Sequence, residues 1–299
     1  MDFIPSEKAT SIRNPSTANL LIDSIDRTDG TSSTQFSINK KNSIMNGFFT
    51  RLAVSEIVLD YNISNVSSQW SNNGFGVLIG STTTYITPLF TGFYTVKDAL
   101  DAIVAGLNSA LGSNTFSITN TSGAGSTAKA CLTKTSGAFT ILATDASGNI
   151  LNLPAQLGFL LNYSDVSFIA VSPGILPHTY IDFCSNTLTY NQKLKDDSTS
   201  SNVRDVLYRW VMGWDSEPTY DAYGYPILQG YRPFRARRSI AFPKQVRWEP
   251  NMPIGQLTFE LFSSDGLIIP TGYYGQTSTS IPTYSGVLEW NMTLLVSEV

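Results

Sequence analysis

The segment GVLEWNMTLLVSEV (residues 286–299), at the end of the chain, alternates apolar and polar side chains. The apolar positions are Leu288, Trp290, Met292, Leu294 and Val296. The alternate positions, Glu289, Asn291 and Thr293, are polar. A period of two is typical of a strand with one face in a core and the other in solvent. The segment therefore predicts a long, half-buried antiparallel strand as the last element of the chain.

Six further segments are predicted as strands, and they lie towards both ends of the chain. They are residues 19–25, 33–40, 178–191, 206–215, 239–248 and 255–266. The segment 206–215 also fits the spacing of a helix, but Tyr, Trp and Val dominate it and favour a strand. Strands at both ends that must pair across the middle of the chain are typical of a Greek-key sandwich.

Residues 51–61 (RLAVSEIVLDY) differ from these strands because apolar side chains occupy odd and even positions alike. Strict alternation places the apolar residues on two faces, with Ala53, Ile57 and Leu59 on one and Leu52, Val54 and Val58 on the other. A strand wet on one side would alternate cleanly between apolar and polar. We therefore expect this strand to be covered on both faces.

One segment in the middle of the chain has the periodicity of a helix. In FYTVKDALDAIVAGLNSALG (93–112), the apolar residues with helical spacing are Val96, Leu100, Ile103, Leu107 and Leu111. Thr95 and Asp98 have the spacing of a capping box, and Gly112 supplies a stop signal. The surrounding residues, to about 165, contain short strand patterns joined by Gly and Ser. They predict a small α+β unit spliced into a larger antiparallel domain.

The predicted fold class is therefore all-β. We expect a single jelly-roll β-sandwich with an inserted small α+β domain that carries one amphipathic helix. The Cys-Trp-Cys signature of immunoglobulin domains is absent from the sequence. The predicted parts are an N-terminal arm (1–17), a jelly roll in two pieces (18–74 and 169–299) and the insertion domain (75–168).

Composition limits the classes of function. Charged residues make up 14% of the 299 residues, against roughly 25% in an average soluble protein, and the net charge is −4. A surface with few charges suits packing against copies of the same chain. The acidic balance argues against a protein built mainly to bind nucleic acid. We expect no membrane span and no leader segment, and we expect Cys131 and Cys184 to be buried, unpaired thiols in a reducing compartment.

No enzyme is predicted, and no catalytic, cofactor-binding or metal-binding residue is assigned. His178 is the only histidine, so any Ser-His-Asp or Cys-His arrangement would have to use it. Its position after Pro177 at the entry to a strand favours a structural role. Asp23, Asp26 and Asp29 lack the spacing of a twelve-residue calcium loop. We expect them to form turns.

One basic cluster lies in GYRPFRARRSIAFPKQVRW (230–248). Its members are Arg232, Arg235, Arg237, Arg238, Lys244 and Arg247. The interleaved aromatic residues suit a surface that contacts a nucleic-acid backbone. The alternative is a loop and strand whose basic side chains pair with acidic residues of a neighbouring subunit. The sequence leaves both interpretations open.

The order of these segments resembles a known family. NLLIDSIDR is followed by RLAVSEIVLDY, the helical segment, NVRDVLYRW, YGYPILQGY, PKQVRW, GQLTFELFSSDG and a closing EWNMTLLVSE. Together they resemble the penton (minor capsid) proteins of virophages and polinton-like viruses, of the mavirus type, over about residues 19–299. The resemblance lies in the order of the segments, since each one alone is an ordinary strand or helix pattern.

The resemblance implies a structural protein with one jelly roll standing upright on an icosahedral capsid and its insertion domain carried outward. Homopentamers would close the fivefold vertices of the virion and contact a double-jelly-roll major capsid protein, after assembly in the host cytoplasm. The helix at 95–111 would brace the insertion by packing on the short strands of 113–143. The basic cluster would lie between subunits or face packaged DNA. The insertion would be the candidate for contact with a host surface, but no acidic or aromatic cluster in it marks a receptor or sugar pocket, so the sequence leaves open whether it binds anything.

A second hypothesis is a carbohydrate-binding or adhesin-type β-sandwich. Tyrosines in SEPTYDAYGYPILQGY (216–231) and GYYGQ (272–276) would then stack on sugars, unless these loops are aromatic because contacts bury them. A third hypothesis, a glycosidase on a jelly-roll scaffold, requires a pair of carboxylates. Glu56 and Glu260 lie in predicted strands, and nothing in the sequence marks them as such a pair.

Overall fold

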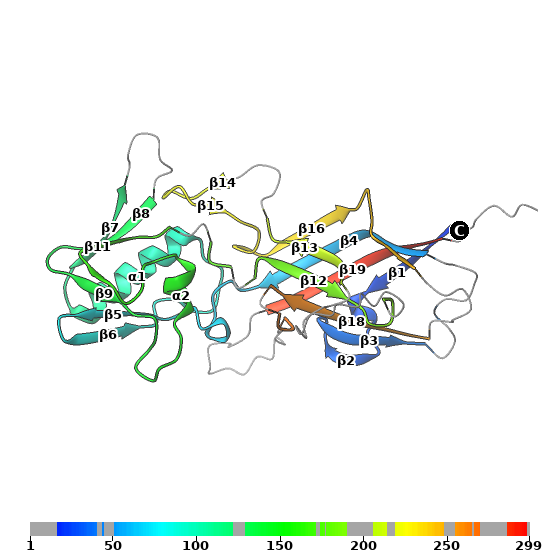
Figure 1. Cartoon of the computed structure of the whole chain (residues 1–299), viewed down its shortest axis with the longest axis horizontal. Coiled ribbons are helices and arrows are strands. Elements are labelled where there is room, and N and C mark those ends of the chain that lie inside the picture. Colours follow the sequence, from blue (N-terminus) through cyan, green and yellow to red (C-terminus); the bar gives the residue numbers. More distant parts are fainter. Residues whose placement is uncertain are drawn as a thin grey trace, which may run out of the picture.

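The computed structural model of the chain contains two hydrophobic units that lie one after the other along its long axis (Figure 1). One is a sandwich formed by both ends of the chain, and the other is formed by its middle. The structure describes residues 17–40, 44, 51–121, 129–171, 174–176, 178–189, 206–213, 219–247, 255–264, 266–269 and 286–297. Of the predicted arm 1–17, only Thr17 lies among them.

The first sheet of the sandwich is antiparallel and has the order β1-β19-β4-β16, with β17 also paired to β4. The strands are β1 (Thr17–Asp23), β4 (Arg51–Ile63), β16 (Phe234–Ser239), β17 (Gln245–Arg247) and β19 (Gly286–Ser297). The predicted final strand is thus confirmed, and it lies inside the sheet. A short 3-10 helix, η1 (Ser24–Asp26), follows β1.

The second sheet has the order β13-β12-β18-β3-β2, again antiparallel. Its strands are β2 (Asp29–Ser32), β3 (Gln35–Asn39), β12 (Tyr180–Cys184), β13 (Val206–Val211) and β18 (Gln256–Ser263). If β16 and β17 count as one strand and the edge strand β2 is set aside, the eight remaining strands, lettered B to I in chain order, give sheets B-I-D-G and C-H-E-F. That topology is a jelly roll, as predicted. The choice of strand over helix for β13 is confirmed.

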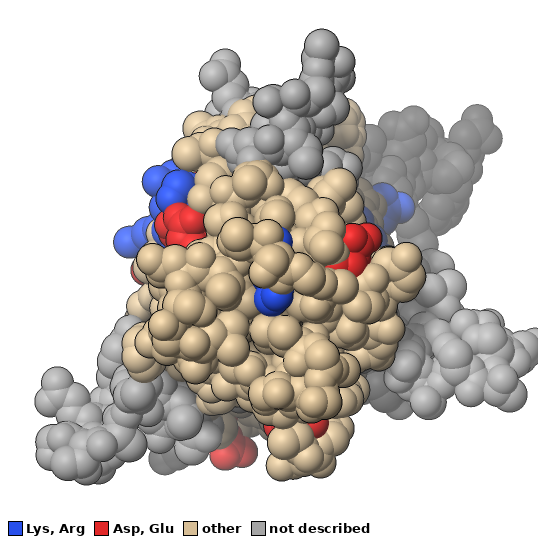
Figure 2. Space-filling view, turned by 90° about the vertical axis from the view of Figure 1, so that its left-hand side faces the viewer, with Lys and Arg blue, Asp and Glu red and all other residues tan. Residues whose placement is uncertain are grey.

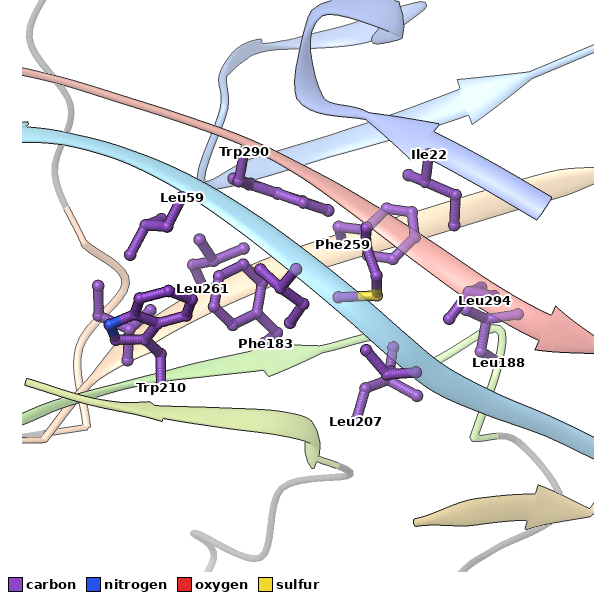
Figure 3. Close-up of a cluster of buried hydrophobic side chains, with 14 of the residues drawn as sticks. Ile22, Leu59, Phe183, Leu188, Leu207, Trp210, Phe259, Leu261, Trp290 and Leu294 are labelled. Carbon is purple, nitrogen blue, oxygen red and sulfur yellow. The ribbon is translucent and has the colours of Figure 1, made fainter. Parts of the chain in front are cut away.

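Aromatic rings from both sheets meet in the core of the sandwich around Trp290 (Figure 3). Its ring centroid lies 5.2 Å from that of Phe259, 5.3 Å from that of Phe183 and 5.6 Å from that of Phe36. The buried indole Nε1 donates to the carbonyl oxygen of Ser33 at 2.9 Å, so this large side chain leaves no polar group unsatisfied.

Strand β4 shows that the prediction of two covered faces was wrong. The pairing with β19 shifts register, because Glu56 lies opposite Thr293 and Val54 lies opposite Leu294, which leaves Ser55 as an extra residue. Such a bulge reverses the alternation of side chains. Leu52 and Val54 therefore join the same core as Ile57, Leu59, Tyr61 and Ile63. On the outer face only Ala53 is buried, whereas Val58 is half-buried and Asp60 is exposed.

The second unit lies between β4 and β12, in the D–E connection of the jelly roll. One sheet has the order β10-β9-β5-β6 and another β11-β8-β7. The strands are β5 (Phe75–Ile79), β6 (Thr82–Ile86), β7 (Phe116–Thr121), β8 (Lys129–Lys134), β9 (Phe139–Ile141), β10 (Ser164–Asp165) and β11 (Ser167–Ile169). The helices are η2 (Ser68–Trp70), α1 (Val96–Leu111) and α2 (Asn152–Gln156). The hydrophobic cluster of this unit runs from Val66 to Ile175 and includes Tyr225.

Helix α1 has the predicted ends. Both hydrogen bonds of the capping box between Thr95 and Asp98 are present, and Gly112 ends the helix with a positive φ of 65°. Its buried residues are Val96, Ala99, Leu100, Ile103 and Leu107. The side chain of Asn108 bridges to both backbone polar groups of Phe116 in β7, at 2.8 and 2.9 Å. The helix also contacts β6, so it braces both sheets of the unit.

Two further expectations differ from the structure. Residues 239–248 do not form one strand, because β16 ends at Ser239 and β17 starts at Gln245. Pro243 lies between them, and proline cannot donate to a sheet ladder. The segment to about residue 165, for which only short strands joined by Gly and Ser were predicted, also contains the short helix α2. The predicted domain bounds of 75–168 stay a prediction.

The bulge in β4 gives a sharp test of this arrangement. Ile57→Lys puts an ammonium group into the core, where the wild-type residue is 0% exposed. We expect it to lower the free energy of unfolding by at least about 3 kcal/mol. Val58→Lys, on the outer face, should change it by less than about 1 kcal/mol. Denaturant titration of both variants measures the difference. Equal losses would contradict the single buried face.

Candidate functional site

The only histidine has a structural setting at the base of the inserted unit. His178 lies two residues before β12 and is 1% exposed, and its Nε2 lies 2.8 Å from the hydroxyl oxygen of Tyr61 near the end of β4. Burial raises the pKa of the Tyr61 hydroxyl. The ring of Trp70 meets His178 edge-on, with centroids 6.0 Å apart. The pair therefore joins the two points where the chain leaves and re-enters the sandwich.

The aspartates of the first turns bind backbone amides. Asp23 accepts a hydrogen bond from the Ile25 amide at 2.9 Å, and Asp29 accepts one from the Gly30 amide at 2.9 Å. Turn formation, the expected role, is confirmed for Asp23, which caps η1, whereas Asp29 is the first residue of β2. Among the residues described by the structure, no group of three His, Cys, Asp or Glu side chains is arranged to hold a metal ion.

The two glutamates considered as a glycosidase pair lie in different sheets. Glu56 in β4 forms an ion pair with Arg237 at 2.5 Å. Glu260 in β18 accepts a hydrogen bond from the side-chain amide of Gln35 at 3.2 Å. Each carboxylate thus has its own partner on its own sheet. The expectation that the chain is not an enzyme stays a prediction.

The basic cluster lies on the β16 edge of the first sheet, and part of it ties the two sheets together. The Arg238 guanidinium lies 4.1 Å from the centroid of the Trp210 ring and donates to the Val211 carbonyl oxygen at 3.1 Å. Lys244 Nζ donates to the Val206 carbonyl oxygen at 3.2 Å. Both acceptors belong to β13, the facing edge of the second sheet. These basic residues therefore close one side of the sandwich.

Two members of the cluster are left for other contacts. Arg232 and Arg235 are exposed, and neither has an ion-pair partner within the part of the chain that the structure describes. Arg247 belongs to β17, and its side chain lies outside the described residues. The alternatives of a neighbouring subunit or nucleic acid therefore concern chiefly Arg232 and Arg235. The assignment of the cluster to either partner stays a prediction.

A hairpin of the sandwich fastens the inserted unit from outside. The connection from β13 to β16 contains β14 (Thr219–Tyr220) and β15 (Pro226–Ile227). The Asp221 carboxylate accepts hydrogen bonds from the amides of Tyr223 and Tyr225 in the hairpin, at 2.9 and 3.0 Å. Its other oxygen accepts from the Lys97 amide in the first turn of α1 at 3.0 Å. An anionic group is favourable at a helix N-terminus.

The tyrosines of this connection are used within the chain. Tyr223 donates to Asp101 Oδ1 at 2.6 Å, and burial together with this bond raises the pKa of Tyr223 to about 12. The hydroxyl of Tyr225 donates to the Ala170 carbonyl oxygen at 2.5 Å. The hydroxyl of Tyr231 accepts from the Ile175 amide at 3.0 Å. Of the four tyrosines considered for sugar stacking here, only Tyr220 is exposed. GYYGQ (272–276) lies outside the described residues.

The distal face of the inserted unit is almost uncharged (Figure 2). Only seven residues between Ser64 and His178 are charged, namely Lys97, Asp98, Asp101, Lys129, Lys134, Asp145 and Asp165. No described helix of the chain is both long and apolar enough to cross a bilayer.

The hairpin contact generates a test on Asp221. Asp221→Ala removes two hydrogen bonds within the hairpin and the one that joins the hairpin to α1, and it should weaken this contact by about 1–3 kcal/mol. Hydrogen exchange of the Lys97, Tyr223 and Tyr225 amides should become faster. Asp145→Ala is the matched control, because Asp145 accepts from Ser147 and Asn149 only within its own loop. An unchanged exchange rate at Lys97 in Asp221→Ala would contradict the fastening role.

The chain was compared with solved structures, with protein-family models and with curated protein sequences. Among solved structures, the crystal structure of the mavirus penton protein aligns with 96% of this chain and 100% of that chain, at 12% identity and a TM-score of 0.49. No protein-family model matches the chain, and no curated protein sequence matches it significantly.

Proposed function

We propose that the chain is a minor capsid (penton) protein whose homopentamers close the fivefold vertices of an icosahedral virion. The observation that carries this proposal is the placement of the inserted unit. It lies in the D–E connection of a single jelly roll, at one end of a molecule whose sandwich strands run broadly along its long axis (Figure 1). The order of the sequence segments, which resembles virophage and polinton-like pentons, supports the same reading.

The architecture suits a ring around a vertex. With the strands upright, the two long edges of the sandwich, β1 with β2 on one side and β16 with β13 on the other, face neighbours in the ring. Such a contact is heterologous, since one edge of each subunit meets the other edge of the next. The inserted unit then points along the ring axis and away from the shell. Its neutral surface carries few hydrated charges that would oppose a contact.

The partners in this proposal are four further copies of the chain and a double-jelly-roll major capsid protein. The protein would reside at the capsid vertices of the virion after assembly in the host cytoplasm. No catalytic step is proposed. The contact of the β14–β15 hairpin with α1 and the contact of Tyr61 with His178 give the inserted unit a fixed direction. A fixed direction suits a part that projects from a shell.

The mass of the purified chain in solution tests the proposal, measured by analytical ultracentrifugation alone and with a double-jelly-roll coat protein. We expect a complex of five chains, or fivefold assemblies located at the vertices of shells formed with the coat protein. Electron microscopy of the complexes along their axis should show five subunits. A chain that stays monomeric and enters no shell would overturn the proposal, and so would a closed ring of another number.

A further inference from the structure

One aromatic side chain stands almost entirely in solvent. Phe242 is 97% exposed in the turn 240–244 between β16 and β17. The ends of this turn are held in place, because the Ile240 amide donates to the Ser55 carbonyl oxygen at 2.9 Å and Lys244 binds the carbonyl of Val206. A phenylalanine ring gains much by leaving water. Here a fixed turn presents it outward.

A hollow that fits such a ring lies at the opposite edge of the sandwich, between β1 and the strands β3 and β18 of the second sheet. Its volume is about 190 Å³, and its lining consists of Leu20, Leu21, Ile22, Asp26, Thr28, Ile38, Lys40, Ile44 and Leu257. A largely aliphatic cavity of about 150 Å³ is enough to bind benzene. Leu21 at this hollow is itself 75% exposed, so apolar surface is open to a partner there.

The turn and the hollow lie at the same height along the strands. One row of paired residues across the sheet joins Leu21, Thr293, Glu56 and Ser239. A second row joins Asn19, Leu295, Ala53 and Gln245. The turn 240–244 spans the interval between Ser239 and Gln245, so Phe242 is level with the segment Asn19–Leu21. Figure 1 shows β16 and β1 on opposite sides of β4 and β19.

Charges of opposite sign follow in the same order on the two edges. The next row links Arg237 in β16 to Asp23 in β1, through Val58 and Asn291. Beyond it lie the exposed Arg235 on one edge and the exposed Asp26 on the other. Lys40 is the one basic residue in the lining of the hollow. At the same height along the strands, an apolar group on one edge thus corresponds to an apolar group on the other edge. In the same way, basic residues on the first edge correspond to acidic residues on the second.

We propose that Phe242 of one subunit inserts into the hollow beside Leu21 of the next subunit, with Arg235 placed against Asp26. This inference rests on the proposed pentamer and names its contact. Because both halves lie at one height along the strands, repetition of the contact around an axis parallel to the strands returns to its start. A heterologous contact with that property closes into a ring, whereas a difference in height would give a helical filament.

Two single variants test the contact. Phe242→Asp removes the aromatic side chain, and Leu21→Arg fills the hollow with a charged side chain. Both positions are exposed, so both variants should keep the wild-type thermal unfolding curve. Loss of a buried aromatic anchor should raise the dissociation constant about 30-fold or more, and each variant should sediment as a single chain where the wild type forms rings. Ile150→Asp, at a residue 67% exposed on the inserted unit, should still form rings.

A mixture of the two variants gives the decisive measurement. The Phe242→Asp variant keeps an intact hollow, and the Leu21→Arg variant keeps the phenyl ring of Phe242. One molecule of each can therefore join through a single intact contact. We expect complexes of two chains and no closed rings. If the wild type assembles only with coat protein, the same variants are compared by vertex occupancy in shells. Rings formed by both variants, or a mixture that stays monomeric, would overturn this contact while wild-type pentamers still support the proposed function. A wild-type chain that never assembles would overturn both.

Discussion

The pairing of β4 with β19 is the constraint on which the rest of the structure depends. β4 ends at Ile63, directly before the inserted unit, and β19 closes the described chain, yet the two share twelve paired positions. This ladder requires that the whole middle of the chain lie outside the sandwich. It also sets the two remaining edges of the first sheet, since β1 can pair only with β19 and β16 only with β4.

The inserted unit is held by more than its two chain crossings. A unit joined through two strands alone would be expected to swing relative to its host. Here Tyr61 and His178 bind each other at the crossings, and Asp221 reaches from the β14–β15 hairpin to the first turn of α1. Beyond the two crossings, the β14–β15 hairpin therefore contacts the unit as well. Its direction is a property of the fold, and the nearly uncharged distal face keeps one orientation relative to the strands.

Local periodicity was enough to predict α1, β18 and β19, because each satisfies its own pattern of burial within one sheet or cluster. β4 was predicted incorrectly because the bulge at Ser55 arises from its register with β19, which a single segment does not contain. The basic residues were visible as a cluster, but the reach of Arg238 and Lys244 to β13 depends on the distance between two sheet edges. Phe242 carried no signal at all, since a phenylalanine among apolar neighbours is typical of a strand.

The two edges also explain why the proposed contact relies on side chains. An exposed edge strand offers unpaired backbone groups that can join another sheet, and charged side chains are a common protection against this. β16 carries Arg235, Arg237 and Arg238, and two of these already bind within the subunit. Sheet extension from β16 would have to displace them. Phe242, in the turn beyond β16, offers a contact that leaves these bonds intact, so the sandwich can form fully before any neighbour arrives.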